Sequence, residues 1–439
     1  MDIRPLTVCV AVCAALVAAC HGCSTGREFI TTFLPNYLHS YGRQRTLHLA
    51  LTAQDSDATI TIKVSSLGFS RTLRLSAGQS RWVPLPHGSE LQKQFVNEKS
   101  AVQISSTAAI SVVSFNRRFA SGDGAVVSPT EQLGTDYFVF TPSGGHSSMD
   151  KLVAIVNGKS QNRITILPRA DVSLRNVRWT RGKAMTIRLA PYASYLLRGR
   201  TTLTGTRIQS QTPVAVLAGH QCLSMGGRCD HVYEQLPPVH SLGKEYMVPK
   251  TGREKTTNQA VIVAVEDNTE LTLHSRKQKL ARAGDVILQK LIYKRPLVVK
   301  SNKKIMVLLL SDNRPFDPFL ITLIPTCKLS TDWAVETVGG LQNTVSILSE
   351  KEGAASVKVC WSGRCISPRW SYLLSDKQWV WSNVDVGQQQ SHVRVEGDAL
   401  MAVYAYGGKH RHSYGMAGVC SEEHNFYGKS LIKMSSNLW

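Results

Sequence analysis

The sequence lacks the patterns of a helical or membrane-embedded protein. Apolar residues do not recur at spacings of three and four over any long window, which argues against a helical bundle. Beyond the N-terminal segment, the longest strongly apolar run, Ile305–Leu310, has the length of a strand rather than the roughly 18 residues of a membrane helix. We therefore predict strands as the main element and no membrane span.

Catalytic motifs are also missing. The sequence contains no G-x-S-x-G elbow, no H-E-x-x-H pair, no glycine-rich phosphate loop and no EF-hand calcium loop. A hydrolase would need a nucleophile and a base that only the fold brings together. We predict a protein that is not an enzyme, with no catalytic residues and no cofactor.

One cluster, which contains His220, Cys222, Cys229, Asp230 and His231, could imitate a metal site. The C-x-x-C spacing of zinc sites is absent, and an exported chain favours disulfides. We therefore interpret the cluster as a disulfide loop with surface histidines and predict no bound metal.

The N-terminus predicts export. A short charged start precedes an apolar core over residues 6–20, followed by small residues that suit a signal peptidase. We assign residues 1–22 to a signal peptide and predict a secreted, extracellular product. An alternative is a bacterial lipoprotein box, in which Cys20 would carry the lipid.

The cysteines predict disulfides. Ten are present, and three of them, Cys9, Cys13 and Cys20, fall in the signal segment. Two pairs bracket short glycine-containing turns, and a third follows by elimination. Cys23 is left over and is either free or bonded to a second chain. The predicted pairs are Cys222 with Cys229, Cys360 with Cys365, and Cys327 with Cys420.

The chain is strongly basic, with 51 Lys and Arg against 31 Asp and Glu and a formal net charge of +20. Basic runs can be solvated turns that keep strand edges from pairing, or they can attract sulfated or sialylated mucin and proteoglycan chains. Nucleic acid is not expected, because no aromatic residues interleave with these runs. The candidate binding residues are Arg276, Lys277 and Lys279 in one run and His410, Arg411 and His412 in another.

Two landmarks recur four times in the same order. The first is a small residue, any residue, an acid and then an aromatic that opens a strand. The second is a strand, a polar turn and a strand, whose apolar ends lie six positions apart. The first landmark occupies Gly26–Phe29, Gly134–Tyr137, Gly243–Tyr246 and Ser330–Trp333. The second joins Ile104 to Ile110, Ile208 to Val214, Val299 to Ile305, and Val395 to Met401.

This recurrence predicts four tandem repeats. We place β-rich modules at 23–122, 123–230, 231–326 and 327–420, with a C-terminal tail over 421–439. Period-two alternation dominates each module, as in Ala260–Val265 before the turn 266–268. The fold class is all-β, with sandwich-like modules packed in series; the alternative is a propeller-like closure of the repeats. Tryptophans 370, 379 and 381 are expected to fill the core rather than form a ligand cage.

One stretch carries a family resemblance. It holds Cys222, the run Cys229-Asp230-His231, the run Glu234-Gln235-Leu236-Pro237-Pro238, and Gly243–Tyr246. Together these residues resemble the N-terminal domain of the IgG-Fc-binding protein family of mucus. The resemblance implies a secreted, non-enzymatic binding module with immunoglobulin Fc or mucus components as partners. Mucus-type members continue into cysteine-rich von Willebrand D-type arrays, which this sequence does not contain, so network formation is not implied.

We therefore predict a binding or adhesion protein that acts through exposed turns and sheet faces. The 222–229 loop is either a displayed binding loop or a structural staple. The alternative function is a basic glycan-binding protein that recognises acidic mucin or proteoglycan chains. Salt distinguishes the two, since binding driven by charge weakens steeply with ionic strength.

Overall fold

The computed structural model describes residues 24–37, 45–118, 121–145, 149–174, 177–225, 229–252, 256–273, 276–291, 295–373, 378–409 and 412–420. These residues form strands joined by turns and by single turns of 3-10 helix. The all-β prediction is confirmed. Within this described part, no helix has the length and apolar character needed to cross a membrane.

The strands fall into four consecutive groups, which we call modules 1 to 4. Module 1 contains β1 (Gly26–Thr31), β2 (Arg45–Ala53), β3 (Ala58–Val64), η2 (Ser65–Leu67), β4 (Phe69–Leu75), β5 (Ser80–Leu85), η3 (His87–Ser89), β6 (Phe95–Asn97), β7 (Val102–Arg118) and β8 (Ser121–Val126). Module 2 contains η4 (Thr130–Gln132), β9 (Gly134–Phe138), β10 (Lys151–Asn157), β11 (Asn162–Leu167), β12 (Val172–Leu174), β13 (Val177–Trp179), β14 (Met185–Leu189), β15 (Ser194–Gly199), β16 (Arg207–Ser224) and β17 (Cys229–Gln235).

Modules 3 and 4 complete the chain. Module 3 contains η5 (Val239–Ser241), β18 (Gly243–Val248), β19 (Asn258–Ala264), β20 (Thr269–Leu273), β21 (Arg276–Leu280), β22 (Val286–Lys290), β23 (Leu297–Ser311) and β24 (Phe319–Thr322). Module 4 contains η6 (Thr326–Lys328), β25 (Ser330–Glu336), β26 (Gln342–Glu350), η7 (Ala354–Ser356), β27 (Lys358–Trp361), β28 (Arg364–Ile366), β29 (Ser371–Tyr372), β30 (Trp379–Gly387), β31 (His392–Lys409), β32 (His412–Ala417) and β33 (Val419–Cys420).

Each module contains one curled antiparallel sheet built on a single long strand. The orders β4-β3-β7-β2-β5, β14-β11-β16-β10-β15, β21-β20-β23-β19-β22 and β28-β27-β31-β26-β30 are equivalent, with the long strand in the middle. Two further strands of each module pair with the same long strand, namely β1 and β8 with β7, β9 and β17 with β16, β18 and β24 with β23, and β25 and β32 with β31. Four copies of one topology confirm the predicted repeat.

The two sequence landmarks are partners in this topology. The aromatic of the first landmark lies opposite the first apolar residue of the second, and the small residue lies opposite the other apolar residue. In module 2, Tyr137 is opposite Ile208 and Gly134 is opposite Val214. The same two pairings occur in modules 1, 3 and 4.

The predicted turn inside the second landmark is wrong. Strand β7 runs unbroken through Ile104–Ile110, as the long strands of the other modules run through their own landmarks. The polar residues between the apolar ends are extra residues of the long strand at a register shift in its pairing with the first strand. In module 1, Gly26 pairs with Ile110 but Glu28 pairs with Ser105. A bulge of this kind bends and twists a strand without ending it, which is why it looks like a turn in sequence.

A buried tyrosine fixes the bulge in modules 2 and 3. The hydroxyl of Tyr137 accepts a hydrogen bond from the backbone N–H of Gly134 at 2.9 Å and donates to the carbonyl of Val214 at 2.6 Å. Tyr246 repeats both bonds with Gly243 and Ile305. A larger residue at position 134 is also excluded sterically, because a Cβ at Gly134 would lie 2.5 Å from the Cβ of Pro238.

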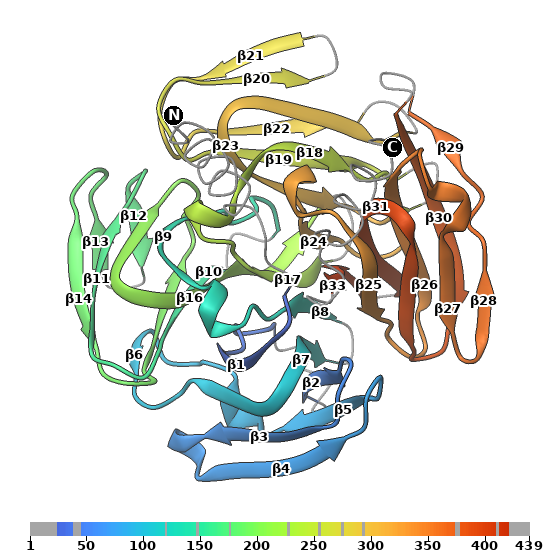
Figure 1. Ribbon diagram of the computed structural model, residues 1–439. Coiled ribbons are helices and arrows are strands. Elements are labelled where there is room, and N and C mark those ends of the chain that lie inside the picture. The colour runs from blue at the N-terminus through green and yellow to red at the C-terminus, as the bar shows by residue number, and fades with distance from the viewer. Residues whose placement is uncertain are drawn as a thin grey trace, which may run out of the picture.

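The four modules surround a common axis instead of following one another in a row (Figure 1). Strands β8, β17, β24 and β32, one from each module, lie around this axis and pack on one another as a closed cycle. We call these four strands the hub. The closure matches the propeller-like alternative, although each module keeps its own curled sheet.

The apolar cores cross the module boundaries. One core joins Val153 and Ile155 of module 2 to Val261 and Leu308 of module 3, and another joins Phe115 of module 1 to residues of module 4. Modules 3 and 4, and modules 1 and 2, share cores in the same way. Strand β6 adds a further link, since it pairs with β15 in the sheet of module 2. Adjacent modules therefore stabilise each other.

Candidate functional site

Two buried aspartates join the hub strands. Asp230 on β17 accepts hydrogen bonds from the backbone N–H groups of Gly122 at 2.6 Å and Ser413 at 3.0 Å. Asp123 on β8 accepts from the backbone N–H groups of Tyr233 at 3.3 Å and Gly415 at 3.2 Å. Each carboxyl thus connects its own module to two others. The hub is a polar junction that holds modules 1, 2 and 4 in register.

Burial dominates the electrostatics of this junction. It raises the pKa of Asp123 and Asp230 well above the usual range, and the neighbouring carboxyls Glu234 and Asp317 add to the effect. The backbone donors partly offset it, because hydrogen bonds to a carboxylate favour the charged form. Glu234 on β17 is buried as well, and its pKa is raised in the same way.

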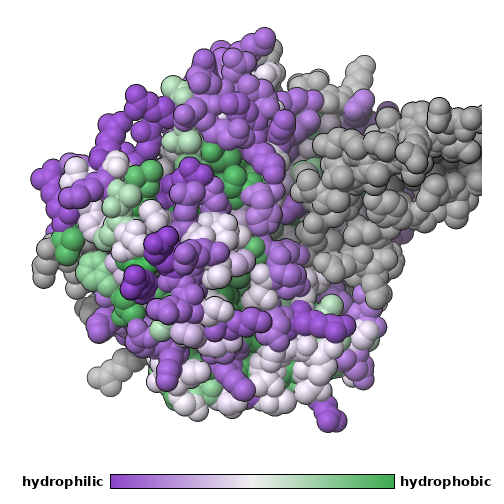
Figure 2. All heavy atoms as spheres, turned by 60° about the vertical axis from the view of Figure 1, so that its left-hand side comes forward, coloured by the Kyte–Doolittle hydropathy of each residue, from purple (hydrophilic) through white to green (hydrophobic). Residues whose placement is uncertain are grey.

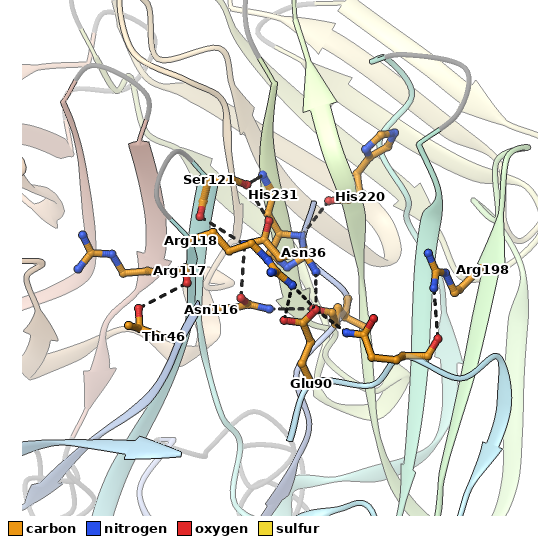
Figure 3. Close-up of polar contacts among 12 residues, drawn as sticks. Asn36, Thr46, Glu90, Asn116, Arg117, Arg118, Ser121, Arg198, His220 and His231 are labelled. Carbon is orange, nitrogen blue, oxygen red and sulfur yellow. Dashed lines mark hydrogen bonds and ion pairs between the residues drawn. The ribbon is translucent and has the colours of Figure 1, made fainter. Parts of the chain in front are cut away.

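A second polar network lies between modules 1 and 2 (Figure 3). Glu90 and Arg118 form a buried, two-bond ion pair at 2.8 and 2.9 Å. Asn36 lies beside them and donates to the side-chain oxygen of Asn116 at 3.3 Å. The hydroxyl of Ser121 donates to Asn36 and accepts from the backbone N–H of His231. This network connects β7 and β8 to β17.

His220 and His231 are fully buried in this region, so the prediction of surface histidines is wrong. The Nδ1 atom of His220 accepts from the backbone N–H of Cys222 at 3.0 Å, and Nδ1 of His231 lies 3.1 Å from the carbonyl of His220. Burial lowers the pKa of His220 to about 4 and that of His231 to about 3, helped by Lys151 and Arg118 respectively. Both rings are therefore neutral near neutral pH.

A pocket opens between the other ends of the hub strands. Its volume is about 120 Å³, and every module contributes to its wall. We call it the axial pocket. Buried Glu234 and Gln235 of β17 lie in its wall, and within the described residues neither Oε1 of Glu234 nor either polar atom of the Gln235 amide has a hydrogen-bond partner. The other lining residues include Val126, Ser128, Pro237, Pro238, Ser241, Leu323, Ile324, Lys328 and Trp333.

The predicted basic binding residues do not come together. Arg276, Lys277 and Lys279 lie on β21, which pairs only with β20 among the described strands and forms an outer edge of module 3. His412 is half-buried at the start of β32, in the hub. His410 and Arg411 lie outside the described residues. The two runs thus occupy different parts of the molecule, and their role in binding stays a prediction.

Two of the predicted cysteine pairs are bonded in the structure. Cys222 is joined to Cys229 and Cys360 to Cys365, each across a hairpin. The predicted bond between Cys327 and Cys420 is wrong. Cys420 is disulfide-bonded, but Cys327 is an exposed cysteine of η6 that takes no part in that bond. Cys23, which the prediction left over, lies outside the described residues.

The described residues do not assemble a metal site. No group of three or more His, Cys, Asp or Glu side chains in this part of the chain is arranged to hold an ion. The tryptophans behave as predicted, since Trp379 is buried and Trp370 and Trp381 pack against the cores. On the face that Figure 2 shows, hydrophilic residues predominate and hydrophobic ones appear in small separate groups.

The polar residues of the hub and of the axial pocket were not identified as a site from the sequence. Asp230, Glu234 and Gln235 stand in the run that carried the family resemblance, but nothing local marks them as buried. Asp123, which lies within β8, has no local signal of burial either.

The comparisons with known proteins confirm the family that this run of residues indicated. The family model described as "IgGFc binding protein" matches residues 123–407, which include the hub strands β17 and β24 and most of the axial pocket. The chain is 25% identical over 407 residues to the human protein named IgGFc-binding protein, and the match covers 90% of this chain. It spans only 8% of that relative's length. This chain belongs to the IgGFc-binding protein family.

Proposed function

We propose that the protein is a secreted, non-enzymatic binding module whose partner is the Fc part of immunoglobulin G. The family match carries this proposal, because it covers well over half of the chain and extends across modules 2, 3 and 4. The relative's name speaks of Fc binding, and this chain corresponds to a small part of that relative. The predicted signal peptide and the disulfides fit an extracellular setting.

The architecture suits binding without chemistry. Shared cores hold the four sheets in fixed positions, so the turns and outer edges that they display are preorganised. A preorganised surface loses little conformational entropy when it engages a partner. Mucus components are further candidate partners, because the resemblance places the family in mucus.

The test is a binding measurement with the secreted chain. The full-length precursor is expressed in a secretory host, and N-terminal sequencing of the product tests removal of residues 1–22. Surface plasmon resonance then compares immobilised Fc fragment with Fab fragment at low and moderate ionic strength. Binding to Fc alone that persists at moderate salt supports the proposal. Equal responses on Fc and Fab, or none on either, would contradict it.

One observation favours the glycan-binding alternative. Arg163 on β11 and Arg188 on β14 lie directly opposite each other, and both are exposed. Like charges in this position destabilise a sheet, and an anion between them would relieve the repulsion. Gln161 and Gln211 line the same shallow hollow.

This alternative has its own test. Retention of the protein on sulfated mucin and on heparin is measured across a salt gradient. If the arginine pair binds the anion, Arg188→Gln lowers the eluting salt concentration, whereas Arg71→Gln on the outer strand β4 leaves it unchanged. Equal shifts for the two variants would show that only overall charge matters.

A further inference from the structure

We propose that a disulfide bond between Cys23 and Cys420 closes the ring of four modules covalently. Cys420 is disulfide-bonded. Two other bonds use four of the ten cysteines, and Cys327 is a thiol, so the partner of Cys420 stands in the N-terminal segment, outside the described residues. Once the predicted signal peptide over residues 1–22 is removed, Cys23 is the only cysteine left in that segment. Such a bond is independent of the proposed Fc binding.

Cys420 occupies the position at which other modules pass the chain to their successors. In modules 1 and 3, the aromatic of the first landmark pairs with the last residue of its own module, which is Pro129 or Pro325. After each of these prolines the chain continues directly into the next module. In module 4 the aromatic is Trp333, and its partner is Cys420. A cysteine therefore stands where a peptide connection to the next module would begin.

The two ends of the described chain meet in the wall of the axial pocket. The three segments that join successive modules contribute residues to this wall, namely 127–129, 236–238 and 323–325. Ser24 and Cys420 line the same pocket. Thr25, which follows Ser24, is 2% exposed and leads into β1, so the start of module 1 is packed into the molecule. Because Cys23 directly precedes Ser24 in the sequence, the described ends converge where the bond would form.

The boundary between modules 4 and 1 is the one that the chain itself does not cross. Modules 1 and 2 also share a sheet through β6, but among the described strands none of module 1 pairs with one of module 4. Side chains hold this boundary instead. The hydroxyls of Thr52 and Ser80 donate to the buried carboxyl of Glu336 at 2.9 and 3.0 Å, and Phe115 packs into a core of module 4. A cross-link between the two chain ends supplies the covalent connection that the other three boundaries have.

Formation of this bond is a two-electron oxidation. The thiols of Cys23 and Cys420 lose two protons and two electrons, and a disulfide of an oxidoreductase in the secretory pathway is reduced to two thiols by exchange. The oxidising compartments through which exported chains pass maintain such bonds. The loop closed by Cys23 and Cys420 contains almost the whole mature chain, so in the loop-entropy model this cross-link restricts the unfolded state more than either hairpin bond does.

Peptide mapping of the wild-type secreted protein tests the pairing directly. Thiols are alkylated with N-ethylmaleimide, and the protein is digested with trypsin without reduction. The expected product joins a peptide that ends at Arg27 to the peptide 412–429, while Cys327 carries the alkyl group. Alkylated Cys23, or a bond between Cys327 and Cys420, would overturn the proposal. On a non-reducing gel the protein should run as a monomer, whereas a reducible dimer would show that Cys23 bonds to a second chain instead.

A single cut in the chain tests whether the bond closes the ring. A protease site is inserted in the exposed turn 266–268, and the cut protein is denatured in SDS without reductant. The two fragments are expected to stay together as one band and to separate after reduction, because each hairpin bond lies within one fragment. Cys23→Ser should release the fragments without reduction, whereas Cys327→Ser, the matched control, should leave them joined. Separation of the wild-type fragments without reductant would refute the closed ring, and this wild-type result alone decides the question if Cys23→Ser does not fold.

Discussion

Buried His220 gives the stability of this protein a defined dependence on pH. Its pKa is lowered to about 4 in the folded state, first by burial and then by Lys151. A base whose folded pKa lies below its unfolded value stabilises the fold only while it stays neutral. That stability is present above the unfolded value of about 6.5 and is lost as the pH falls towards the folded value.

The size of the effect follows from the two pKa values. With an unfolded pKa of about 6.5 and a folded pKa of about 4, protonation of His220 in the unfolded chain removes about 2 kcal/mol of folding free energy at pH 5. The hub carboxyls act in the opposite direction. Burial raises the pKa of Asp123 and Asp230, so they add stability as the pH falls. Only a difference between variants isolates the histidine.

We therefore compare the wild type with His220→Asn, whose side-chain oxygen can still accept from the N–H of Cys222. The free energy of unfolding in urea is measured between about pH 7.5 and pH 5. The stability advantage of the wild type should shrink by about 2 kcal/mol over this range. His87→Asn, at an exposed histidine of η3, should show a constant difference. A constant difference for His220→Asn would refute the reasoning.

Three further predictions concern the repeated landmark and the disulfide. Tyr137→Phe removes two buried hydrogen bonds and should lower the free energy of unfolding by about 1–3 kcal/mol, whereas Tyr372→Phe, at a residue 59% exposed, should change it little. Gly134→Ala should cost about 1–3 kcal/mol in the same urea assay, because the new Cβ meets a proline ring at 2.5 Å. Replacing Cys222 and Cys229 by serine should cost about 2 kcal/mol, the loop-closure entropy of a short loop.

Each of these outcomes has a result that contradicts it. If the two tyrosine variants unfold at the same urea concentration, the hydroxyl does not hold the bulge. An alanine at Gly134 with wild-type stability would mean that the linker proline moves aside freely. Peptide mapping without reduction provides the control for the cysteine pair, because recovery of Cys222 and Cys229 as unlinked thiols in the wild type would remove the basis of that prediction.

The sequence predicts the modules well because their signals are local. The landmark Gly134–Tyr137 recurs as one pattern of residue types, and its partners Ile208 and Val214 recur at a fixed spacing. Four sheets of one topology could therefore be anticipated. The closure of the four modules around a common axis could not be anticipated from the sequence. It depends on contacts such as that of Asp123 with Gly415, which lie far apart in the chain and leave no periodic trace.

Burial of polar residues was the main failure for the site. His220 and His231 look like surface residues beside a disulfide, and Glu234 and Gln235 look like a polar turn before two prolines. All four are buried because neighbouring modules cover them, which is a property of the assembled ring rather than of the strand that carries them. The axial pocket exists only once the four hub strands meet.

The shared cores have a consequence for how the chain could be divided. A cut between β17 and β18 would separate modules 1 and 2 from modules 3 and 4, and each half would carry two apolar faces that only the other half covers. Two such halves are complementary, like the fragments of a split reporter protein, and their association restores both apolar interfaces at once. Deletion of one module, by contrast, leaves two apolar faces that are not complementary to each other, so the remaining three modules cannot close around the axis.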